Sequence, residues 1–434
     1  MRNGAVDMSA LRRDLMATGA AVSDDAAATF AVDGRAPQCV VFPESVAQLS
    51  QCLAATARAG AAVIPAGNGT QLTTGGVPSR YDVAVSTRHL RRIVAHEAAD
   101  MTVTVEAGAT LAELNEALAA TRQRLPLDPP HPARRTLGGV IAADACGPWR
   151  LSQGKVRDLL IGITVVLADG TIVHGGGRVV KNVAGYDLMK LFTGSYGTLG
   201  VIAEATFKVR PLPAREEVLC IPAQSGETAV TVALEVRAAP LAPQYVSAVN
   251  ETAAQAIGLE RAAVLVGCAG DAEEVNVQRA RANAVTGGIQ LCGETEGARL
   301  YSALRDWPAA NDTCGGCRIS VVPTQLAGVL GRIAREAVRH HLGAAIVAHV
   351  GNGVAVVRFI GAPAGNALVA LARWTRAQVR ALGGWVVFDR LPAALKSEID
   401  PWGTEAPGLA LMRGIKQTLD PHGRLSPGRF VGGI

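Results

Sequence analysis

Three passages rich in glycine and other small residues constrain the fold of this chain most. They read P-A-G-N-G-T at 65–70, T-L-G-G-V-I-A-A-D-A-C-G at 136–147 and G-S-Y-G-T-L-G-V-I at 194–202. Glycine permits positive φ and carries no side chain, so backbone N–H groups can converge on an anion and backbone can lie against a flat ligand. The three passages are therefore expected to close around one ligand.

Each passage taken alone has an ordinary structural explanation. The first fits a glycine turn between a strand and a helix, the second fits tight packing of a helix on a sheet, and the third fits close approach of a neighbouring strand. The dinucleotide fingerprint G-x-G-x-x-G is not met, because Leu72 stands where the third glycine belongs. Their occurrence together, in this order, favours a ligand.

Strand and helix signals alternate in the first half of the chain. Ser45 and Gln48 form an S-x-x-Q capping box, and Gly60 is placed to end the helix that follows. A second unit has a strand at 102–106 and a helix capped by Thr110 and Glu113, and residues 162–174 read as a β-hairpin. This half is predicted to be α/β.

The pattern changes after Pro211 and Pro213. Strands at 262–266, 346–350 and 354–360 alternate with alanine-rich helices, which indicates an antiparallel sheet with helices on one face. A chain of 434 residues is also too long for one core. We predict an α+β fold with four parts, an N-terminal segment (1–36), a two-subdomain α/β domain (37–213), an α+β cap domain (214–395) and a C-terminal segment returning to the first domain (396–434).

Composition and charge exclude several classes. The net charge of +5 is dispersed in basic pairs, which gives no nucleic-acid footprint, and the longest strongly apolar stretch, 159–168, is far shorter than the ~20 residues of a bilayer span. The N-terminus lacks the apolar block of a secretory signal, so a cytoplasmic protein is expected. Most of the eight cysteines are expected to be free, buried thiols, and the Cys314/Cys317 pair lacks the second ligand pair of a zinc site.

The motifs resemble those of a known family. Residues from about 37 to 211 are similar to the FAD-binding domain of the vanillyl-alcohol oxidase and p-cresol methylhydroxylase (PCMH) superfamily, and within it to the FAD-binding subunits of bacterial glycolate oxidases. The middle of the chain is only loosely similar. The matching runs are 65–70, 102–108, 125–130, Gly138-Gly139, 177–187, 194–200, 399–403 and 426–434.

The resemblance implies FAD as cofactor, with Gly67 to Thr70 at its pyrophosphate. The relatives that bind flavin covalently carry His or Cys at defined positions, whereas Asn68 and Thr70 stand in this loop, so non-covalent FAD is expected. The full set of implied cofactor-binding residues is Pro65, Ala66, Gly67, Asn68, Gly69, Thr70, Pro129, Thr136, Gly138, Gly139, Gly147, Gly154, Arg157, Asp158, Gly200, Val201 and Ile202.

The resemblance also implies partners. They are a catalytic flavoprotein subunit and an iron-sulfur subunit, which together would oxidise a small 2-hydroxyacid, glycolate, to glyoxylate and reach a membrane only indirectly. Three departures from the family pattern bear on FAD binding: Asp144 replaces an Asn, Cys146 a Ser, and Ser426 the Asn of a terminal Asn-Pro-Gly. An added carboxylate beside a pyrophosphate would weaken binding.

Catalytic residues are not assigned. The catalytic relatives carry H-x-G-D-G-N-x-H and a later Glu-His pair as metal ligands and base, but this chain reads H-V-G-N-G-V-A-V from His349 and has Asp389-Arg390 at the later pair. A lone His349 on an apolar strand is more often a satisfied core residue than a base. We therefore expect an FAD carrier without a metal site.

Two alternative functions remain: an assembly subunit with a vestigial FAD site, and a self-sufficient 2-hydroxyacid oxidase. Two roles are open for three residues before Asp187: a structural strand-to-helix turn, or direct contact with substrate. They are Lys181, Asn182 and Tyr186.

Overall fold

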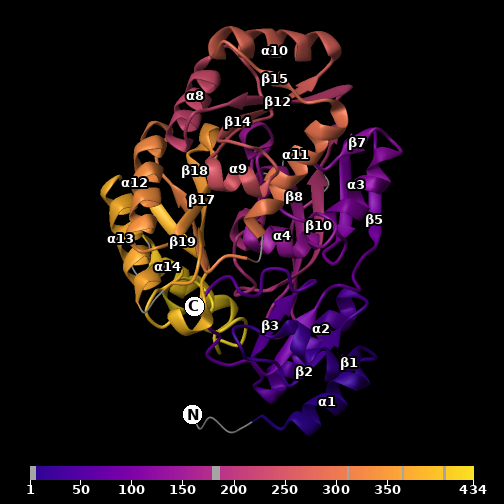
Figure 1. Ribbon diagram of the computed structural model, residues 1–434. Helices are drawn as coiled ribbons and strands as arrows, with labels where there is room; N and C mark the ends of the chain where they lie inside the picture. The colour runs from indigo at the N-terminus through magenta and orange to yellow at the C-terminus, as the bar shows by residue number, and fades with distance from the viewer. Residues whose placement is uncertain (1–5, 178–185, 310–311, 364–365, 404–406) are drawn as a thin grey trace.

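The computed structural model describes residues 6–177, 186–309, 312–363, 366–403 and 407–434. Two smaller sheets from the first half of the chain lie below and beside a larger sheet from the second half (Figure 1). The C-terminal segment, in yellow, returns toward the first half. In the described part of the chain, helices fall short of the length and apolar character that a membrane crossing needs.

The first sheet has the order β1-β2-β4-β3, and its strands β2, β4 and β3 are parallel. Ser45 caps helix α2 by accepting a hydrogen bond from the N–H of Gln48, and Gly60 ends that helix at φ +67°, as the sequence predicts. The reciprocal half of the predicted capping box is not formed, because the Gln48 side chain accepts from the N–H of Glu44 instead of that of Ser45. Strand β3 leads directly into the first glycine-rich passage. The elements are α1 (Met8–Ala17), β1 (Ala21–Ser23), β2 (Cys39–Phe42), α2 (Val46–Ala59), β3 (Val63–Ala66) and β4 (Val83–Ser86).

The second sheet is antiparallel, in the order β5-β6-β10-β8-β9. The predicted hairpin is β8 and β9, and Thr110 and Glu113 form the predicted capping box of α3. Its elements are β5 (Ile93–Glu97), β6 (Thr102–Glu106), α3 (Leu111–Ala119), α4 (Leu137–Ala143), α5 (Arg150–Gln153), α6 (Val156–Leu159), β8 (Leu160–Val166), β9 (Ile172–Gly176), α7 (Leu188–Phe192) and β10 (Val201–Lys208). A short pair, β7 (Gln123–Arg124) and β11 (Arg210–Pro211), lies beside it.

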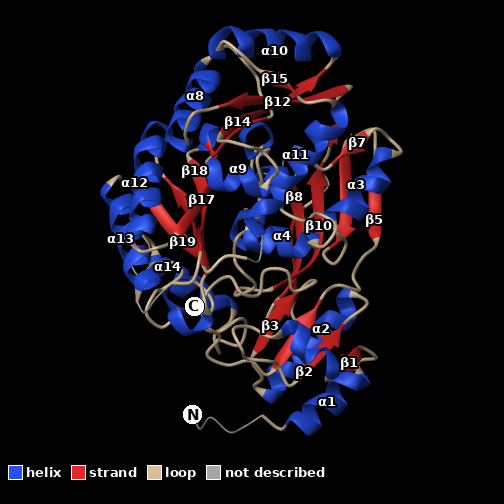
Figure 2. Ribbon diagram, in the orientation of Figure 1, coloured by secondary structure: helices blue, strands red, loops and turns tan. Residues whose placement is uncertain are grey.

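The cap is an eight-stranded antiparallel sheet in the order β15-β12-β14-β13-β17-β18-β16-β19 (Figure 2). Its strands are β12 (Arg215–Pro222), β13 (Tyr245–Val249), β14 (Ala263–Gly270), β15 (Gln290–Leu291), β16 (Gly315–Ser320), β17 (Gly343–His349), β18 (Val354–Ile360) and β19 (Trp385–Arg390). Its helices are α8 (Gly226–Ala238), α9 (Glu251–Ala256), α10 (Ala272–Thr286), α11 (Glu294–Asp306), α12 (Leu326–Arg339) and α13 (Ala367–Ala381).

The predicted α+β fold class is confirmed, but the cap helices cover both faces of the sheet rather than one. Alternate residues of β14 separate into two cores: Val264 and Val266 pack in the core that includes α8, α12 and α13, whereas Leu265 packs in a smaller core with residues of α9 and α11. The smaller core is on the face that carries the contacts to the first half of the chain.

The C-terminal segment is tied to the first sheet. After α14 (Leu409–Leu419), Leu425 forms a parallel bridge with Val63 of β3. The N–H of Val63 donates to the carbonyl of Arg424 and the N–H of Ser426 donates to the carbonyl of Val63, both at 2.8 Å. The end of the chain thus lies beside the strand that precedes the glycine loop. The residue boundaries of the predicted domains stay predictions.

Candidate functional site

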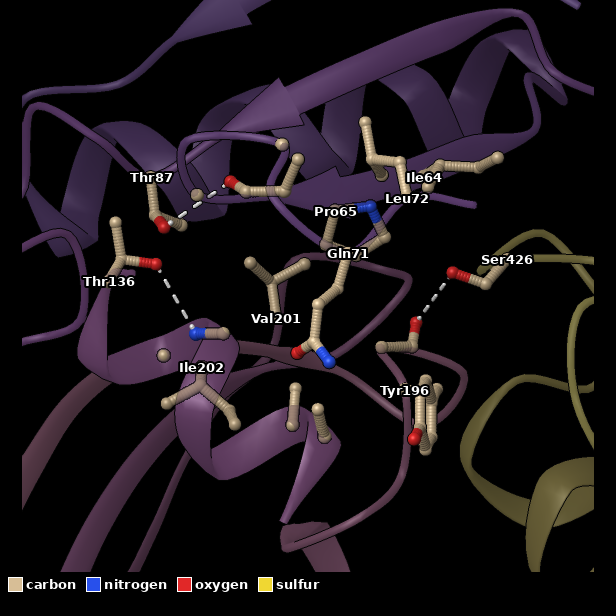
Figure 3. A pocket seen from close by; sticks show the side chains of 18 of the residues that line it. Ile64, Pro65, Gln71, Leu72, Thr87, Thr136, Tyr196, Val201, Ile202 and Ser426 are labelled. Atoms are coloured by element: carbon tan, nitrogen blue, oxygen red, sulfur yellow. Dashed lines mark hydrogen bonds between the residues drawn. The ribbon is translucent and has the colours of Figure 1, made fainter. Parts of the chain in front are cut away.

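A cavity of about 810 Å³, partly open to solvent, lies where the three glycine-rich passages meet (Figure 3). We call it the main cavity. Twelve of the predicted cofactor-binding residues line it, namely Pro65, Ala66, Gly67, Asn68, Gly69, Thr70, Thr136, Gly138, Gly139, Gly200, Val201 and Ile202.

The loop from Gly67 to Gln71 offers the main cavity a row of backbone donors. Within the described part of the chain, no acceptor is bonded to the N–H groups of these five residues. Gly69 adopts φ +74°, a conformation that glycine takes at little cost. The side-chain amide of Asn68 already has a partner within the protein, because it donates to the carbonyl of Arg134 at 3.0 Å. Unsatisfied successive amides are the chemistry that holds a phosphate group.

Most of the glycines in the wall are also required by contacts within the protein. A Cβ on Gly67 would lie 2.0 Å from Thr136 Oγ1, one on Gly138 would lie 2.8 Å from Ala107 Cβ, and one on Gly200 would lie 2.4 Å from Val165 Cγ1. The small residues therefore let the three passages approach one another. That close approach is what forms a cavity with a backbone-lined wall.

Helix α4 does not add free amides to the cavity. The N–H of Leu137 donates to Ala109, the N–H of Gly138 donates to Ala107, and Thr136 Oγ1 accepts from Gly139 at 3.4 Å. The donors at its first turn are thus used within the protein. Any phosphate in the main cavity is left to the loop from Gly67 to Gln71.

The C-terminal segment contributes Ser426 and Arg429 to the wall of the main cavity. The sequence links Ser426 to FAD binding but indicates no role for Arg429. The Arg429 guanidinium donates to the carbonyls of Leu72, Thr74 and Gly76 at 2.6, 2.7 and 3.1 Å. Arg429 thereby fixes the end of the glycine loop.

Tyr196 is a second missed residue. It lines the main cavity at φ +52°, an unusual conformation for a bulky side chain, and its ring lies 4.7 Å from that of Trp402 and 5.6 Å from that of Phe430. The signal for it was present in the third passage, whose glycines flank this one aromatic residue. Three aromatic rings thus join the third passage to the C-terminal segment.

A second cavity lies between the first half of the chain and the cap, and we call it the seam cavity. Its volume is about 530 Å³, and it is lined by Pro130, Asp144, Cys146, Gly147, Pro148, Arg150, Leu304, Arg305, Pro308, Arg318, His349, Asn352, Val354 and Val356. Arginines from both sides dominate its polar wall, so its electrostatic character favours an anion.

Asp128 holds the seam closed. Its carboxylate accepts from the N–H groups of Gly147 and Trp149 at 2.9 and 2.7 Å and from the hydroxyl of Tyr301 in the cap at 3.1 Å. The rings of Trp149 and Tyr301 stack at 5.4 Å. The N–H of His131 also donates to Asp306 of the cap at 2.7 Å. These contacts position one wall of the seam cavity against the other.

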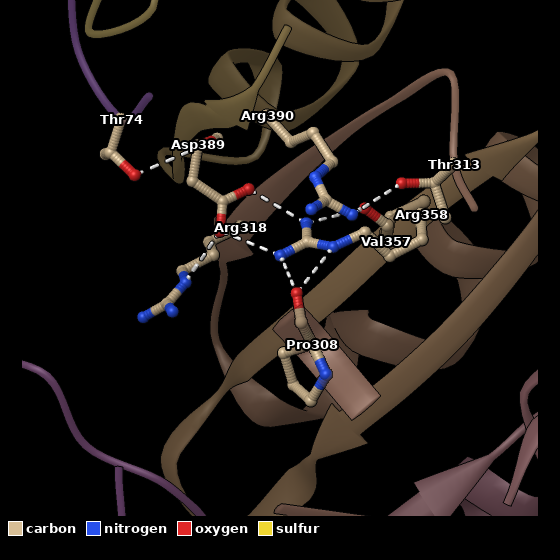
Figure 4. Close-up of polar contacts among 8 residues, drawn as sticks. All are labelled: Thr74, Pro308, Thr313, Arg318, Val357, Arg358, Asp389 and Arg390. Atoms are coloured by element: carbon tan, nitrogen blue, oxygen red, sulfur yellow. Dashed lines mark hydrogen bonds and ion pairs between the residues drawn. The ribbon is translucent and has the colours of Figure 1, made fainter. Parts of the chain in front are cut away.

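Asp389 organises the arginines on the cap side (Figure 4). Arg358 binds it through two hydrogen bonds of 2.8 and 2.9 Å, and Arg318 Nε donates to it at 3.1 Å. Burial acts to raise the pKa of Asp389, but the two guanidiniums outweigh it and hold that pKa below its ordinary value. Asp389 therefore stays ionised and orients Arg318, which lines the seam cavity.

The other titratable groups of the seam cavity are neutral or paired. Burial, aided by the charges of Arg318 and Arg150, lowers the pKa of His349 to about 4, and its Nδ1 lies 3.0 Å from Ser247 Oγ. Burial also raises the pKa of Cys146 to about 12. Asp144 lies 3.4 Å from Lys155 Nζ and faces the seam cavity, not the main cavity. Its charge is therefore not added beside the glycine loop.

Five predicted cofactor-binding residues lie outside the main-cavity wall. Gly147 lines the seam cavity, Pro129 is buried next to Asp128, Gly154 lies in the turn between α5 and α6, and Arg157 and Asp158 lie in α6. There Asp158 accepts a hydrogen bond from the N–H of Lys155. Their contact with a cofactor stays a prediction. Lys181 and Asn182 lie outside the described residues, and Tyr186 is 94% exposed.

The candidate metal residues are dispersed. Among the described residues, no group of three or more His, Cys, Asp or Glu side chains could hold a metal ion. Cys314 Sγ donates to the carbonyl of Phe359 and Cys317 is buried in the cap core. Arg390, one of the two residues at the position of the later Glu-His pair, donates a hydrogen bond to the hydroxyl of Thr313.

The fold and the main cavity together define a flavoprotein of the PCMH type. The structure of p-cresol methylhydroxylase with substrate bound superimposes with a TM-score of 0.78 over 99% of this chain and 98% of that chain, at 14% identity, which shows the fold alone. The model of the FAD binding domain matches residues 37–176, and that of the C-terminal domain of FAD linked oxidases matches residues 212–430.

The chain belongs to the family of FAD-linked oxidases. It is 28% identical to a probable mitochondrial D-lactate dehydrogenase of Danio rerio, over 92% of this chain and 85% of that protein. It is 32% identical to glycolate oxidase subunit GlcD of Bacillus subtilis and 41% identical to subunit GlcE of Escherichia coli. These two matches span 48% and 28% of this chain but only 44% and 35% of those subunits.

Family membership makes this chain an FAD-dependent oxidoreductase, and its residues fit that cofactor. The free amides from Gly67 to Gln71 would hold the pyrophosphate, and Gly200, Val201 and Ile202, which line the same cavity, would lie against the cofactor. FAD, when bound, accepts a hydride from the carbon that is oxidised.

Proposed function

We propose that this chain is the non-covalent FAD-binding subunit of an enzyme complex that oxidises glycolate to glyoxylate and passes the electrons to partner subunits. The observation that carries the proposal is the adjacency of two sites: a cavity walled by free backbone amides, and an arginine-lined cavity at the seam. The first suits FAD and the second suits the carboxylate of a 2-hydroxyacid.

Arg318 is the residue best placed to bind that carboxylate. Arg318 donates to Asp389 through its Nε alone, and in Figure 4 the two terminal nitrogens of Arg318 point away from Asp389. A guanidinium fork binds a carboxylate through two parallel hydrogen bonds, and burial strengthens them. The names of relatives support a 2-hydroxyacid, since one is a D-lactate dehydrogenase and two are glycolate oxidase subunits.

Removal of the hydroxyl proton is the step that favours a complex over an isolated enzyme. A general base works best when its pKa lies near the operating pH. His349, with a pKa of about 4 and a partner in Ser247, is a weak base at neutral pH. The proposal therefore assigns proton removal to the catalytic flavoprotein subunit, with an iron-sulfur subunit as electron acceptor.

The non-covalent attachment rests on the loop residues. Positions 67–71 read G-N-G-T-Q and offer no His or Cys to a flavin. Cys146, which replaces a Ser of the family pattern, lines the seam cavity with its pKa raised to about 12, so its thiol is a poor nucleophile. Precipitating the protein with acid is expected to release all of its flavin into solution.

The test uses the protein purified from its native host with whatever subunits accompany it. We expect a flavin absorption band that glycolate bleaches anaerobically in the complex, and no bleaching in the isolated chain. Arg318→Gln is expected to raise the glycolate concentration for half-bleaching at least about tenfold, as loss of a charge-assisted bond implies. Arg339→Gln, an exposed arginine of α12, is the control.

Other outcomes select the alternatives. A folded, colourless chain that takes up no FAD would mean a vestigial cofactor site in an assembly subunit. Steady-state oxidation of D-lactate or glycolate by the isolated chain would mean a self-sufficient oxidase. That alternative is favoured by the match to the D-lactate dehydrogenase, which covers nearly the whole chain, whereas the matches to glycolate oxidase subunits cover half or less.

A further inference from the structure

Arg135 is a buried cation that forms no hydrogen bond or ion pair through its side chain with any described residue. Its side chain is 6% exposed, and within the described residues its Nε and Nη1 are enclosed with no hydrogen-bond acceptor. Burial, and next the charge of Arg318, lower its pKa to about 10, so it remains a guanidinium ion at neutral pH. An unpaired buried charge is costly, and proteins seldom retain one without a use.

The loop that carries Arg135 joins the two cavities. Five residues before it, Pro130 lines the seam cavity, and one residue after it, Thr136 lines the main cavity. The N–H of Arg135 donates to the carbonyl of His131, whose own N–H donates to Asp306 of the cap. Arg135 is therefore held by a loop that is fixed at the seam.

The cap presents Arg318 to the same region. Three guanidiniums, those of Arg135, Arg318 and Arg358, lie near the carboxylate of Asp389, which is bonded only to the latter two. The other carboxylate near Arg135 is that of Asp306, which is bonded to Arg305 and to the N–H of His131. No acceptor among the described residues is bonded to the terminal nitrogens of Arg318. The two arginines from opposite sides of the seam thus leave a positive charge that only an added anion would neutralise.

We propose that Arg135, from the FAD-binding half, and Arg318, from the cap, form one carboxylate-binding subsite that spans the seam. Only the identity of the acid, a small 2-hydroxyacid, rests on the proposed function. Two guanidiniums can share one carboxylate, as Arg318 and Arg358 already share Asp389. A ligand bound in this way also ties the cap to the FAD-binding half, so Arg135 determines which acids the seam accepts.

The experiment measures binding of oxalate, an acid of glycolate's size that has no hydrogen to lose as hydride. The full chain with FAD bound is titrated with oxalate, and the flavin absorbance and the melting temperature are both followed. Arg135→Gln is expected to raise the dissociation constant at least about tenfold, and Arg135→Lys less, because it keeps the charge without the fork. Arg134→Gln, at the exposed neighbouring position, is expected to bind oxalate like the native protein.

A second readout separates a ligand site from a structural role. Without oxalate, Arg135→Gln is expected to melt at the native temperature or above it, because an unpaired buried charge has been removed. A clearly lower melting temperature would mean that Arg135 is already stabilised by the protein, and would overturn the proposal. Arg318→Lys is an independent test of the cap side of the subsite. We expect this variant also to bind oxalate more weakly than the native protein.

Native-like oxalate affinity in Arg135→Gln would also overturn the subsite. If the flavin reduction potential of that variant were lowered at the same time, Arg135 would be placed at the flavin ring instead. Failure of the proposed function can be distinguished from failure of the subsite. The effect of oxalate on the melting temperature can still be measured if the complex does not oxidise glycolate or if the chain holds no flavin.

Discussion

Gly67 is the residue on which the cofactor loop most depends. A Cβ there would lie 2.0 Å from Oγ1 of Thr136 and 2.9 Å from its Cβ, so rotating the Thr136 side chain does not clear the contact. The Gly67→Ala variant must move the loop or break the cap of α4. We expect FAD affinity to fall at least about tenfold and stability to fall by about 1–3 kcal/mol, measured by flavin fluorescence titration and urea unfolding.

The matched control for that substitution is Gly414→Ala. Gly414 lies in α14, and a Cβ there would meet nothing within 4 Å. Alanine in an exposed helix is expected to stabilise by about 0.5–1 kcal/mol and to leave FAD binding unchanged. Native-like FAD affinity in Gly67→Ala would contradict the role given to the loop.

Local requirements explain which site residues could be predicted from sequence. Gly67, Gly138 and Gly200 stand out because a close approach of backbone leaves only glycine as a choice. Arg135 and Arg429 have no such local mark. The burial of Arg135 depends on the cap, and that of Arg429 on residues 72–76, both far away in the sequence, so each looks like any surface arginine in the sequence alone.

Helix α14 holds the C-terminal segment against the cofactor site through one lysine. Lys416 Nζ donates to Asp420 Oδ2 at 2.6 Å and to the carbonyls of Thr198 and Leu425 at 2.7 and 2.9 Å. Lys416→Met would leave the Asp420 carboxylate buried and unpaired. We expect a loss of about 3–5 kcal/mol in unfolding free energy and faster FAD release, since Ser426 and Arg429 follow in the main-cavity wall.

Lys190→Met is the comparison for Lys416→Met. Lys190 pairs with Asp187 in a solvent-exposed contact, and such pairs contribute about 0–1 kcal/mol. Unfolding and FAD release are therefore expected to stay native-like in that variant. Equal effects of the two substitutions would show that the buried lysine does not secure the segment.

Helices with strong capping signals were predictable, and α4 was not. Ser45 and Thr110 mark α2 and α3 because each cap satisfies a backbone N–H within the same few residues. Helix α4 has seven residues, two of them glycine, so its intrinsic propensity is low. Its first amides are satisfied by Ala107 and Ala109 of another segment. Tertiary contacts form this helix, and the glycine pattern alone left a helix packed on a sheet as one of two interpretations, without its bounds.

The arrangement of the whole molecule depends on the seam, which no local pattern reveals. The periodic strands and the proline boundary predicted two folded units, but not that cap residues 301–318 would meet residues 128–150. Asp128, Tyr301 and Arg318 lie far apart in the sequence, and each has a side chain common on protein surfaces. The seam cavity could therefore be found only in the folded chain.

Asp128 makes the seam sensitive to pH. Burial raises its pKa to about 7 and outweighs its three hydrogen bonds, which act to lower it. The unfolded carboxyl has a pKa of about 3.9. Between about pH 4 and 7 the unfolded chain has released a proton that the folded chain retains, so this contribution to stability is complete below pH 4 and is lost as pH rises through 7.

Asp128→Asn removes that titration and also places an amide group where three donors need an acceptor. We expect the variant to be less stable than the native protein at pH 4.5, and the native protein to lose more stability than the variant between pH 4.5 and 7.5, as measured by urea unfolding at several pH values. Asp158→Asn, at an exposed carboxylate, controls for the general loss of charge. Parallel profiles for the native protein and Asp128→Asn would mean that the hydrogen bonds from Gly147, Trp149 and Tyr301 outweigh burial and keep Asp128 ionised throughout.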